Sequence, residues 1–180
     1  AHRPESDLSD LLADILVWGG EAFHEKPDFG VYNMGGIRAA FAKGKVTYGD
    51  VLNVAPFENH ICFLTLTGEK VLQLFREMAS VGGEGVSKSV RLVISRDGKL
   101  CSAMIDGKPV DPAARYRVAT LDYLAQGNDK LEAFKAKTNV VSPQEQDYSV
   151  RYIIVNYFKS KAAKGESVNA QVEGRIKYEN

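Results

Sequence analysis

The stretch Val31-Tyr32-Asn33-Met34-Gly35-Gly36-Ile37-Arg38 decides how the rest of this chain is interpreted. A short apolar run ends at an asparagine, two glycines follow, and an arginine closes the segment. Paired glycines allow positive φ and a close approach of the backbone to a ligand, although they also form ordinary tight connections. Asn33 offers an amide, and Arg38 offers a planar fork of five donors. The stretch therefore predicts a strand and a turn that bind a polar, phosphorylated small molecule.

Length and composition indicate one globular domain spanning residues 1–180. Hydrophobic residues make up 44% of the 180 positions and charged residues 26%, which is typical of a chain with its own core. Lys+Arg and Asp+Glu number 23 each, so no net field favours nucleic acid or an anionic membrane as a partner. No apolar run approaches the roughly 20 residues that span a bilayer. The first residues lack an apolar signal core, so we expect any export signal to have been removed or never present.

The periodicity of apolar side chains predicts several helices. They are expected at 8–18, 48–54, 68–81, 131–134 and 147–158. Ser6 or Asp7 should cap the first helix, and Thr67 the third. The glycine-rich stretch 82–85 is expected to form a mobile loop, and 159–165 an exposed basic connector.

Runs of β-branched and aromatic residues predict the strands. They are expected at 29–32, 59–67, 90–95, 100–105, 116–121 and 171–178, and residues 46–47 are expected to form a short strand or an extended piece. The run at 59–67 is apolar on both faces, which indicates an interior strand. Asp97-Gly98 is a strong hairpin signal between two of these strands. Hairpins mixed with helices predict an α+β domain in which helices pack on a mixed β-sheet.

Four further motifs follow the opening stretch in a fixed order. They are G-K-V-T-Y-G-D at 44–50, P-F-E-N at 56–59, L-T-G-E-K-V-L at 66–72 and A-Q-G-N-D at 125–129. Together with N-M-G-G-I-R they resemble the C-terminal, substrate-binding domain of the 5'-nucleotidase/UDP-sugar hydrolase family. That family's pattern runs N-x-G-G-I-R, G-x-I-T-x-x-D, P-F-x-N, L-T-G-x-x-L and A-x-G-G-D. The resemblance extends from about Glu5 to Ile176 and implies the fold of that domain.

The resemblance implies a binding role for five residues. Phe57 matches an aromatic that stacks on the nucleobase, and Tyr123 falls where the family has the opposing aromatic. Asp129 matches the carboxylate that accepts hydrogen bonds from the ribose hydroxyls. Asn33 is expected to contact the base or sugar, and Arg38 the ribose and the α-phosphate side. The sequence alone leaves open that Phe57 is a core residue and that Asp129 is an ordinary turn residue.

Two looser matches and two departures complete the comparison with the family pattern. Gly83 lies in a stretch that matches a segment lining the base pocket, and Arg3 matches an arginine near the phosphate. Tyr123 replaces the family's phenylalanine, which keeps the stacking face and adds a hydroxyl that could shift base preference. Asn128 replaces the second glycine of A-x-G-G-D, and asparagine tolerates the left-handed region that such a loop uses.

The residues needed for two-metal hydrolysis are not recognisable in the sequence. The histidines are His2, His24 and His60, and none forms a pair with ligand spacing. In the family, divalent metals belong to a separate metallophosphatase domain, so we expect no cofactor in this chain. Cys62 and Cys101 fit no metal spacing; two buried thiols are expected, and a disulfide stays open.

Two classes of function remain open at this point. The chain is either the nucleotide-recognition domain of a 5'-nucleotidase-type hydrolase, working with a metallophosphatase domain or partner chain, or a stand-alone nucleotide- or nucleoside-binding module. A relative acting on a cyclic phosphodiester or a sulfur compound belongs to the first class. By resemblance, the protein is exported to the periplasm or the cell surface. An exposed apolar patch flanking Arg38 would favour docking to a partner.

Overall fold

The computed structural model of the chain describes residues 3–145 and 148–180. Its helices are α1 (Asp7–Trp18), α2 (Tyr48–Val54), α3 (Gly68–Ser80), α4 (Asp122–Ala125) and α5 (Val150–Ala163), with 3-10 turns at Gly19–Phe23, Met34–Gly36 and Glu132–Ala136. Its strands are β1 (Phe29–Tyr32), β2 (Ile61–Thr67), β3 (Gly85–Val86), β4 (Val90–Ile94), β5 (Leu100–Ile105), β6 (Lys108–Pro109), β7 (Arg115–Leu121), β8 (Thr138–Val141) and β9 (Ile176–Tyr178). The predicted α+β class is confirmed.

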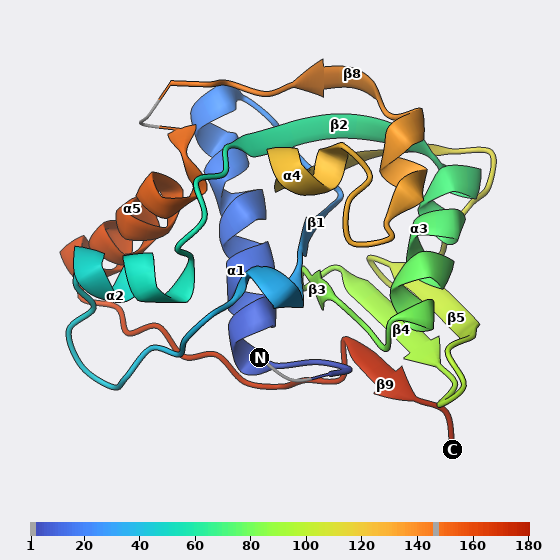
Figure 1. Cartoon of the computed structure of the whole chain (residues 1–180), viewed down its shortest axis with the longest axis horizontal. Coiled ribbons are helices and arrows are strands. Elements are labelled where there is room, and N and C mark those ends of the chain that lie inside the picture. The colour runs from blue at the N-terminus through green and yellow to red at the C-terminus, as the bar shows by residue number, and fades with distance from the viewer. Residues whose placement is uncertain (1–2, 146–147) are drawn as a thin grey trace.

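A five-stranded mixed sheet with the order β3-β1-β7-β2-β8 forms the centre of the molecule (Figure 1). Strand β7 runs parallel to β1 and antiparallel to β2, with Ile61 opposite Leu121. The carboxyl ends of β1 and β7 and the amino end of β2 therefore reach the same edge of the sheet. This edge brings together three of the motifs that lie far apart in the sequence.

Helices cover both faces of this sheet. Alternate side chains of β2 point to opposite sides, and both sets are buried. Ile61 and Phe63 face a core built with α1 and α5, whereas Leu64 and Leu66 face a core built with α3 and the second sheet. The interior position predicted for 59–67 is thereby confirmed.

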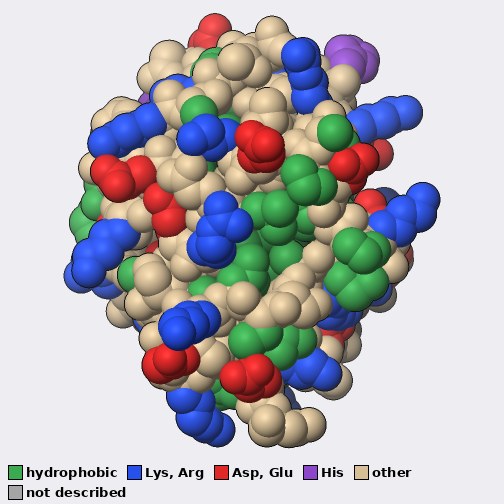
Figure 2. Space-filling view, turned by 90° about the vertical axis from the view of Figure 1, so that its right-hand side faces the viewer, with side chains coloured by type: hydrophobic (Ala, Val, Ile, Leu, Met, Phe, Trp, Pro, Cys, Tyr) green, Lys and Arg blue, Asp and Glu red, His purple; other side chains and the backbone are tan. Residues whose placement is uncertain are grey.

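The remaining strands form a second sheet, with the order β6-β5-β4-β9, rather than extending the first. Strands β4 and β5 pair as the hairpin predicted at Asp97-Gly98, where Gly98 has a φ of 88°. Strand β9 joins β4 in parallel. Figure 2 shows the α3 side of the molecule, where Lys and Arg are interspersed with Asp and Glu around an apolar strip.

Side-chain caps define the starts of the long helices. The Ser6 hydroxyl accepts the backbone N–H of Ser9 at 3.1 Å, and the Thr67 hydroxyl accepts that of Lys70 at 3.3 Å. Both caps were predicted. Each satisfies a donor that the first helical turn cannot pair internally. No helix in the described ranges is long and apolar enough to cross a membrane.

Several predicted boundaries are wrong, and each has a local cause. Of the two alternatives for residues 46–47, the strand is not formed, and Thr47 is extended as the N-cap of α2. The stretch 82–85 is not a free loop, since Glu84 is buried and Gly85 begins β3. Helix α5 continues through most of 159–165, to Ala163, and begins at Val150. Residue 147, where this helix was predicted to start, lies outside the described ranges.

Two further predictions need correction. Strand β9 covers only the last part of 171–178, because Gly174 takes a φ of 84° just before it. Both cysteines are free thiols, but only Cys62 is buried; Cys101 is exposed on β5. A disulfide between them is therefore not present.

A buried charge cluster ties β9 to α1. The Arg175 guanidinium, 4% exposed, donates to both carboxylate oxygens of Asp14 at 2.9 and 2.8 Å and to Glu173 at 2.7 Å. The Glu5 carboxylate accepts the backbone N–H groups of Glu173 and Gly174 at 3.1 and 3.0 Å. These bonds hold the segment before β9 against the first helix.

Gly68 is expected to be intolerant of any side chain. A Cβ at this position would lie 1.7 Å from the Asp111 carbonyl oxygen. Gly68→Ala should therefore lower the free energy of unfolding by about 3 kcal/mol or more, measured by urea denaturation. Gly49→Ala within α2 is the matched control, because its Cβ would meet only Thr47 at 3.7 Å. That control should be neutral or stabilising by about 0.5–1 kcal/mol; equal effects of the two variants would contradict the prediction.

Asp10 is expected to make stability fall as pH rises. Burial, followed by a hydrogen bond with Glu5, raises the pKa of Asp10 from 3.8 to about 9. Between these two pKa values the unfolded chain releases a proton that the folded chain keeps. The free energy of unfolding therefore decreases as pH rises through this range. Asp10→Asn cannot ionise. Its stability relative to wild type should increase by about 1 kcal/mol or more between about pH 5 and pH 8. Parallel stability curves from urea denaturation at each pH would contradict this.

Candidate functional site

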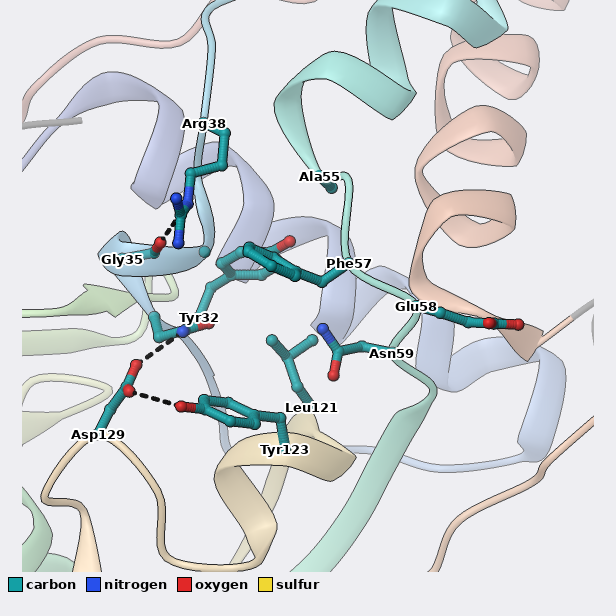
Figure 3. A pocket seen from close by; sticks show the side chains of 12 residues that line it. Tyr32, Gly35, Arg38, Ala55, Phe57, Glu58, Asn59, Leu121, Tyr123 and Asp129 are labelled. Carbon is teal, nitrogen blue, oxygen red and sulfur yellow. Dashed lines mark hydrogen bonds between the residues drawn. The ribbon is translucent and has the colours of Figure 1, made fainter.

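A pocket of about 550 Å³ opens at the sheet edge where β1, β7 and β2 meet (Figure 3). Its lining is drawn from the segments that follow β1 and β7 and from the segment that precedes β2. The lining residues are Tyr32, Asn33, Gly35, Gly36, Arg38, Ala55, Phe57, Glu58, Asn59, Leu121, Tyr123 and Asp129. All five residues with an expected binding role thus lie in one concavity.

Two aromatic side chains remain exposed in this pocket. Phe57 is 46% exposed on the connection between α2 and β2, and Tyr123 is 40% exposed in the first turn of α4. Figure 3 shows their rings on either side of the same pocket. Since Phe and Tyr bury most of their surface in cores, this exposure rules out a core position for Phe57. The arrangement leaves two aromatic faces available to a ligand.

Asp129 is the centre of a hydrogen-bond network at one end of the pocket. Its Oδ2 accepts from the Asn33 amide Nδ2 at 2.7 Å, and its Oδ1 accepts from the Tyr123 hydroxyl at 3.1 Å. Because Asn33 turns its amide nitrogen to a carboxylate, the amide oxygen must point away. Asn33 Oδ1 is buried and accepts no hydrogen bond from any described residue. This oxygen lies against Gly36 and not in the open part of the pocket, so the amide presents its nitrogen side to Asp129.

Arg38 lies beside Phe57 at the mouth of the pocket. Its Nε donates to the Gly35 carbonyl at 2.8 Å, and its guanidinium carbon lies 4.8 Å from the centre of the Phe57 ring. The side chain is exposed. Its two terminal nitrogens make no hydrogen bond within the described residues, so they can serve an anionic group.

The glycine pair works differently from the sequence-based expectation. Met34–Gly36 forms a 3-10 turn, and neither Gly35 nor Gly36 has a positive φ. A Cβ on Gly36 would instead lie 3.0 Å from Asn33 Oδ1. The second glycine therefore makes room for the asparagine side chain, while Gly35 has open space around it.

Arg3 and Gly83 lie behind the pocket rather than on its lining. Arg3 donates to the Gly83 carbonyl and lies 3.3 Å from Glu84. The buried Glu84 carboxylate also accepts the backbone N–H of Met34 at 3.0 Å. Burial raises the pKa of Glu84, while the Met34 N–H and Arg3 oppose that rise. Both predicted residues thus support the turn that carries Asn33, and neither faces the cavity.

Sequence reasoning missed part of the lining. Tyr32 and Leu121 form apolar parts of it as the last residues of β1 and β7, and Asn59 lies beside them. Asn59 belongs to the P-F-x-N motif, which was the available signal. Tyr32 and Leu121 looked like ordinary strand residues, and only the pairing of β1 with β7 places both at the pocket.

Metal ligands do not gather anywhere in the described residues. No group of three or more His, Cys, Asp or Glu side chains there is arranged to hold an ion. His60 Nδ1 lies 3.6 Å from Asp122 Oδ2, a single pair outside the pocket lining. His2 lies outside the described ranges.

Comparison with known proteins relates the whole arrangement to one family. The sequence model described as "5'-nucleotidase, C-terminal domain" matches residues 1–136. Protein UshA of Escherichia coli (strain K12) is 39% identical over 131 residues, which cover 71% of this chain and 24% of that protein. The 5'-nucleotidase of Vibrio cholerae is 32% identical over 108 residues, covering 58% of this chain and 19% of that protein. The chain thus spans a minor part of these relatives' length.

The fold is also found in solved structures. The crystal structure of a 5'-nucleotidase precursor from Thermus thermophilus superposes with a TM-score of 0.84 and 26% identity. The match covers 99% of this chain and 36% of that chain. Both sheets and the helices described above are therefore included in the shared fold, and the solved relative is again much longer.

Proposed function

Because the chain belongs to the 5'-nucleotidase C-terminal domain family, we propose that it is the nucleotide-recognition part of a 5'-nucleotidase-type hydrolase. The observation that supports this most directly is the shared pocket. Phe57, Tyr123, Asp129, Asn33 and Arg38 come from separate segments and still line one cavity of about 550 Å³. This volume falls in the range of sites for small organic ligands.

Each part of a nucleotide has a chemically suitable partner in the pocket. The base would stack between Phe57 and Tyr123, a contact worth about 1–3 kcal/mol per base. The ribose hydroxyls would donate to Asp129, which holds two acceptor oxygens at the end of the cavity. Arg38 would bind the phosphate side with its terminal nitrogens.

Hydrolysis itself is assigned to another part of the protein or to a partner. In the family, divalent metals and their ligands belong to a metallophosphatase domain, and the residues described here do not form such a ligand set. The residues of this chain bind and orient the substrate, which is how a recognition domain contributes to rate.

The alternative is a stand-alone nucleotide- or nucleoside-binding module. A groove of about 1240 Å³ beside the segment after Arg38 favours the two-part hydrolase instead. Half-buried apolar side chains of Leu11, Phe41 and Val155 line it, and partner surfaces commonly have such a character. The greater length of the relatives points the same way. We also propose that the protein works outside the cytoplasm, in the periplasm or at the cell surface, as its resemblance to this family implies.

Phe57→Ala is expected to weaken nucleoside and nucleotide binding to the same degree. The wild-type chain should bind adenosine and AMP with dissociation constants on the order of tens of micromolar to millimolar, since stacking and one or two charge-assisted bonds offset the ordering cost. Removing the ring should increase the dissociation constants of both ligands by about fivefold or more. Calorimetric titration measures this.

Stability measurements separate this effect from unfolding. Phe57 is half exposed, so its replacement should change the free energy of unfolding by less than about 1 kcal/mol. Phe63→Ala, in the core, should cost about 3–5 kcal/mol. Unchanged base binding by folded Phe57→Ala would refute the stacking role.

The 180-residue chain alone is expected to release no phosphate from AMP or UDP-glucose when Mg²⁺ or Mn²⁺ is added. The pocket offers one arginine, and the described residues offer no cluster of metal ligands to stabilise the transition state. A phosphate-release assay on the purified chain measures this. Metal-stimulated release that follows the chain through purification would contradict it.

A further inference from the structure

The two positions that depart from the family pattern contact the same loop. The Asn128 amide donates to the Tyr123 backbone carbonyl at 2.7 Å, and the Tyr123 hydroxyl donates to Asp129 Oδ1 at 3.1 Å. Tyr123 thus holds the loop from 127 to 129 by its backbone and by its side chain. We call Tyr123, Asn128 and Asp129 the Tyr123 clasp. Figure 3 shows the Tyr123 hydroxyl directed at the Asp129 carboxylate.

The loop needs such support because its backbone is neither helix nor strand. Gly127, Asp129 and Lys130 have φ values of 92°, 57° and 65°, whereas Asn128, which would tolerate the left-handed region, does not adopt it. A non-glycine residue in this region is uncommon and is held by its surroundings. Asparagine at 128 therefore contributes a hydrogen bond rather than backbone freedom.

The direction of the hydrogen bond between Tyr123 and Asp129 follows from their chemistry. The Asp129 carboxylate only accepts, so the phenol donates. This bond raises the pKa of Tyr123 above the ordinary value for a phenol, which is itself protonated at neutral pH. The hydroxyl therefore points to the carboxylate, away from the place of a stacked base. The added oxygen of Tyr123 is accordingly expected to act on sugar recognition rather than on base preference.

Asp129 keeps free acceptor capacity despite its two partners. Two carboxylate oxygens offer about four lone-pair positions. Tyr123 uses one on Oδ1 and Asn33 uses one on Oδ2. One position on each oxygen remains, which matches two neighbouring hydroxyl groups. Held on both sides, the carboxylate loses less freedom when such a ligand binds.

We propose that Tyr123 is a positioning residue whose clasp with Asn128 orients Asp129 to accept both hydroxyls of a vicinal diol, which makes the pocket selective for ribonucleosides with a free 2',3'-diol. This inference rests on the proposed nucleotide recognition and adds the residues that determine its sugar selectivity. If the clasp acts in this way, removing the phenol oxygen should reduce affinity only for ligands that carry the sugar hydroxyls.

The experiment compares adenosine with 2',3'-dideoxyadenosine by calorimetric titration. Tyr123→Phe keeps the stacking ring and removes only the hydroxyl. It should weaken the binding of adenosine by about threefold to tenfold. The dissociation constant of dideoxyadenosine should stay within about twofold of the wild-type value. Asn128→Ala should also weaken the binding of adenosine more than the binding of dideoxyadenosine. Tyr48→Phe is the matched control: Tyr48 is also exposed but lies outside this pocket, so neither affinity should change.

The outcomes distinguish the inference from the function on which it rests. If Tyr123→Phe weakens both ligands equally, or weakens neither, the positioning role is overturned while nucleoside recognition stands. If wild type binds both ligands equally well, Asp129 makes no contact with the diol that contributes to affinity, and the inference also fails. If wild type binds neither ligand, the proposed function and the inference fail together. A selective loss for adenosine in both variants supports the proposal.

Discussion

The pairing of β7 with two neighbours of opposite direction is the constraint on which the pocket depends. Parallel pairing with β1 and antiparallel pairing with β2 bring two strand ends and one strand start to the same edge. Leu121 lies opposite Ile61 in this register, so the residues just beyond them become neighbours. A shift by one residue would turn every side chain of a strand to the other face. Backbone hydrogen bonds of the sheet therefore determine where the aromatic residues meet.

Exposed aromatic rings would normally favour association, and the pocket limits this by placing polar groups beside each ring. The Arg38 guanidinium lies over Phe57, and the Asp129 carboxylate holds the Tyr123 hydroxyl. Phe57 is thereby covered from one side by the guanidinium, and Tyr123 is held at its hydroxyl. Behind them, the buried Glu84 links the turn of Asn33 to Arg3. Rigid support of this kind reduces the entropy lost on binding.

Local signals in the sequence were sufficient for the long helices and strands, but not for the short strands β3, β6 and β8 or for the assembly of the elements. Thr67 as a cap and Asp97-Gly98 as a hairpin turn depend on a few neighbouring residues, and both were predicted. The division into two sheets depends on pairings between distant strands, such as β4 with β9, which no local pattern encodes. The site residues came from motif order. The contacts between these residues could not be predicted in this way, because they depend on side-chain geometry. Tyr123 binds Asp129, and Arg3 contacts Glu84 rather than facing the cavity.

The anchoring of β9 also determines the order in which the chain can complete its structure during synthesis. Arg175 and Asp14 are 161 positions apart, and Glu5 and Gly174 are 169 apart. A ribosome would therefore release α1 long before Arg175, whose guanidinium binds the Asp14 carboxylate, is synthesised. The same holds for the backbone N–H of Gly174, which binds the Glu5 carboxylate. Until then these carboxylates remain hydrated, and the first helix lacks its final partner. Contacts of such long sequence separation carry a high loop-closure cost, so we expect this anchoring to form late in folding.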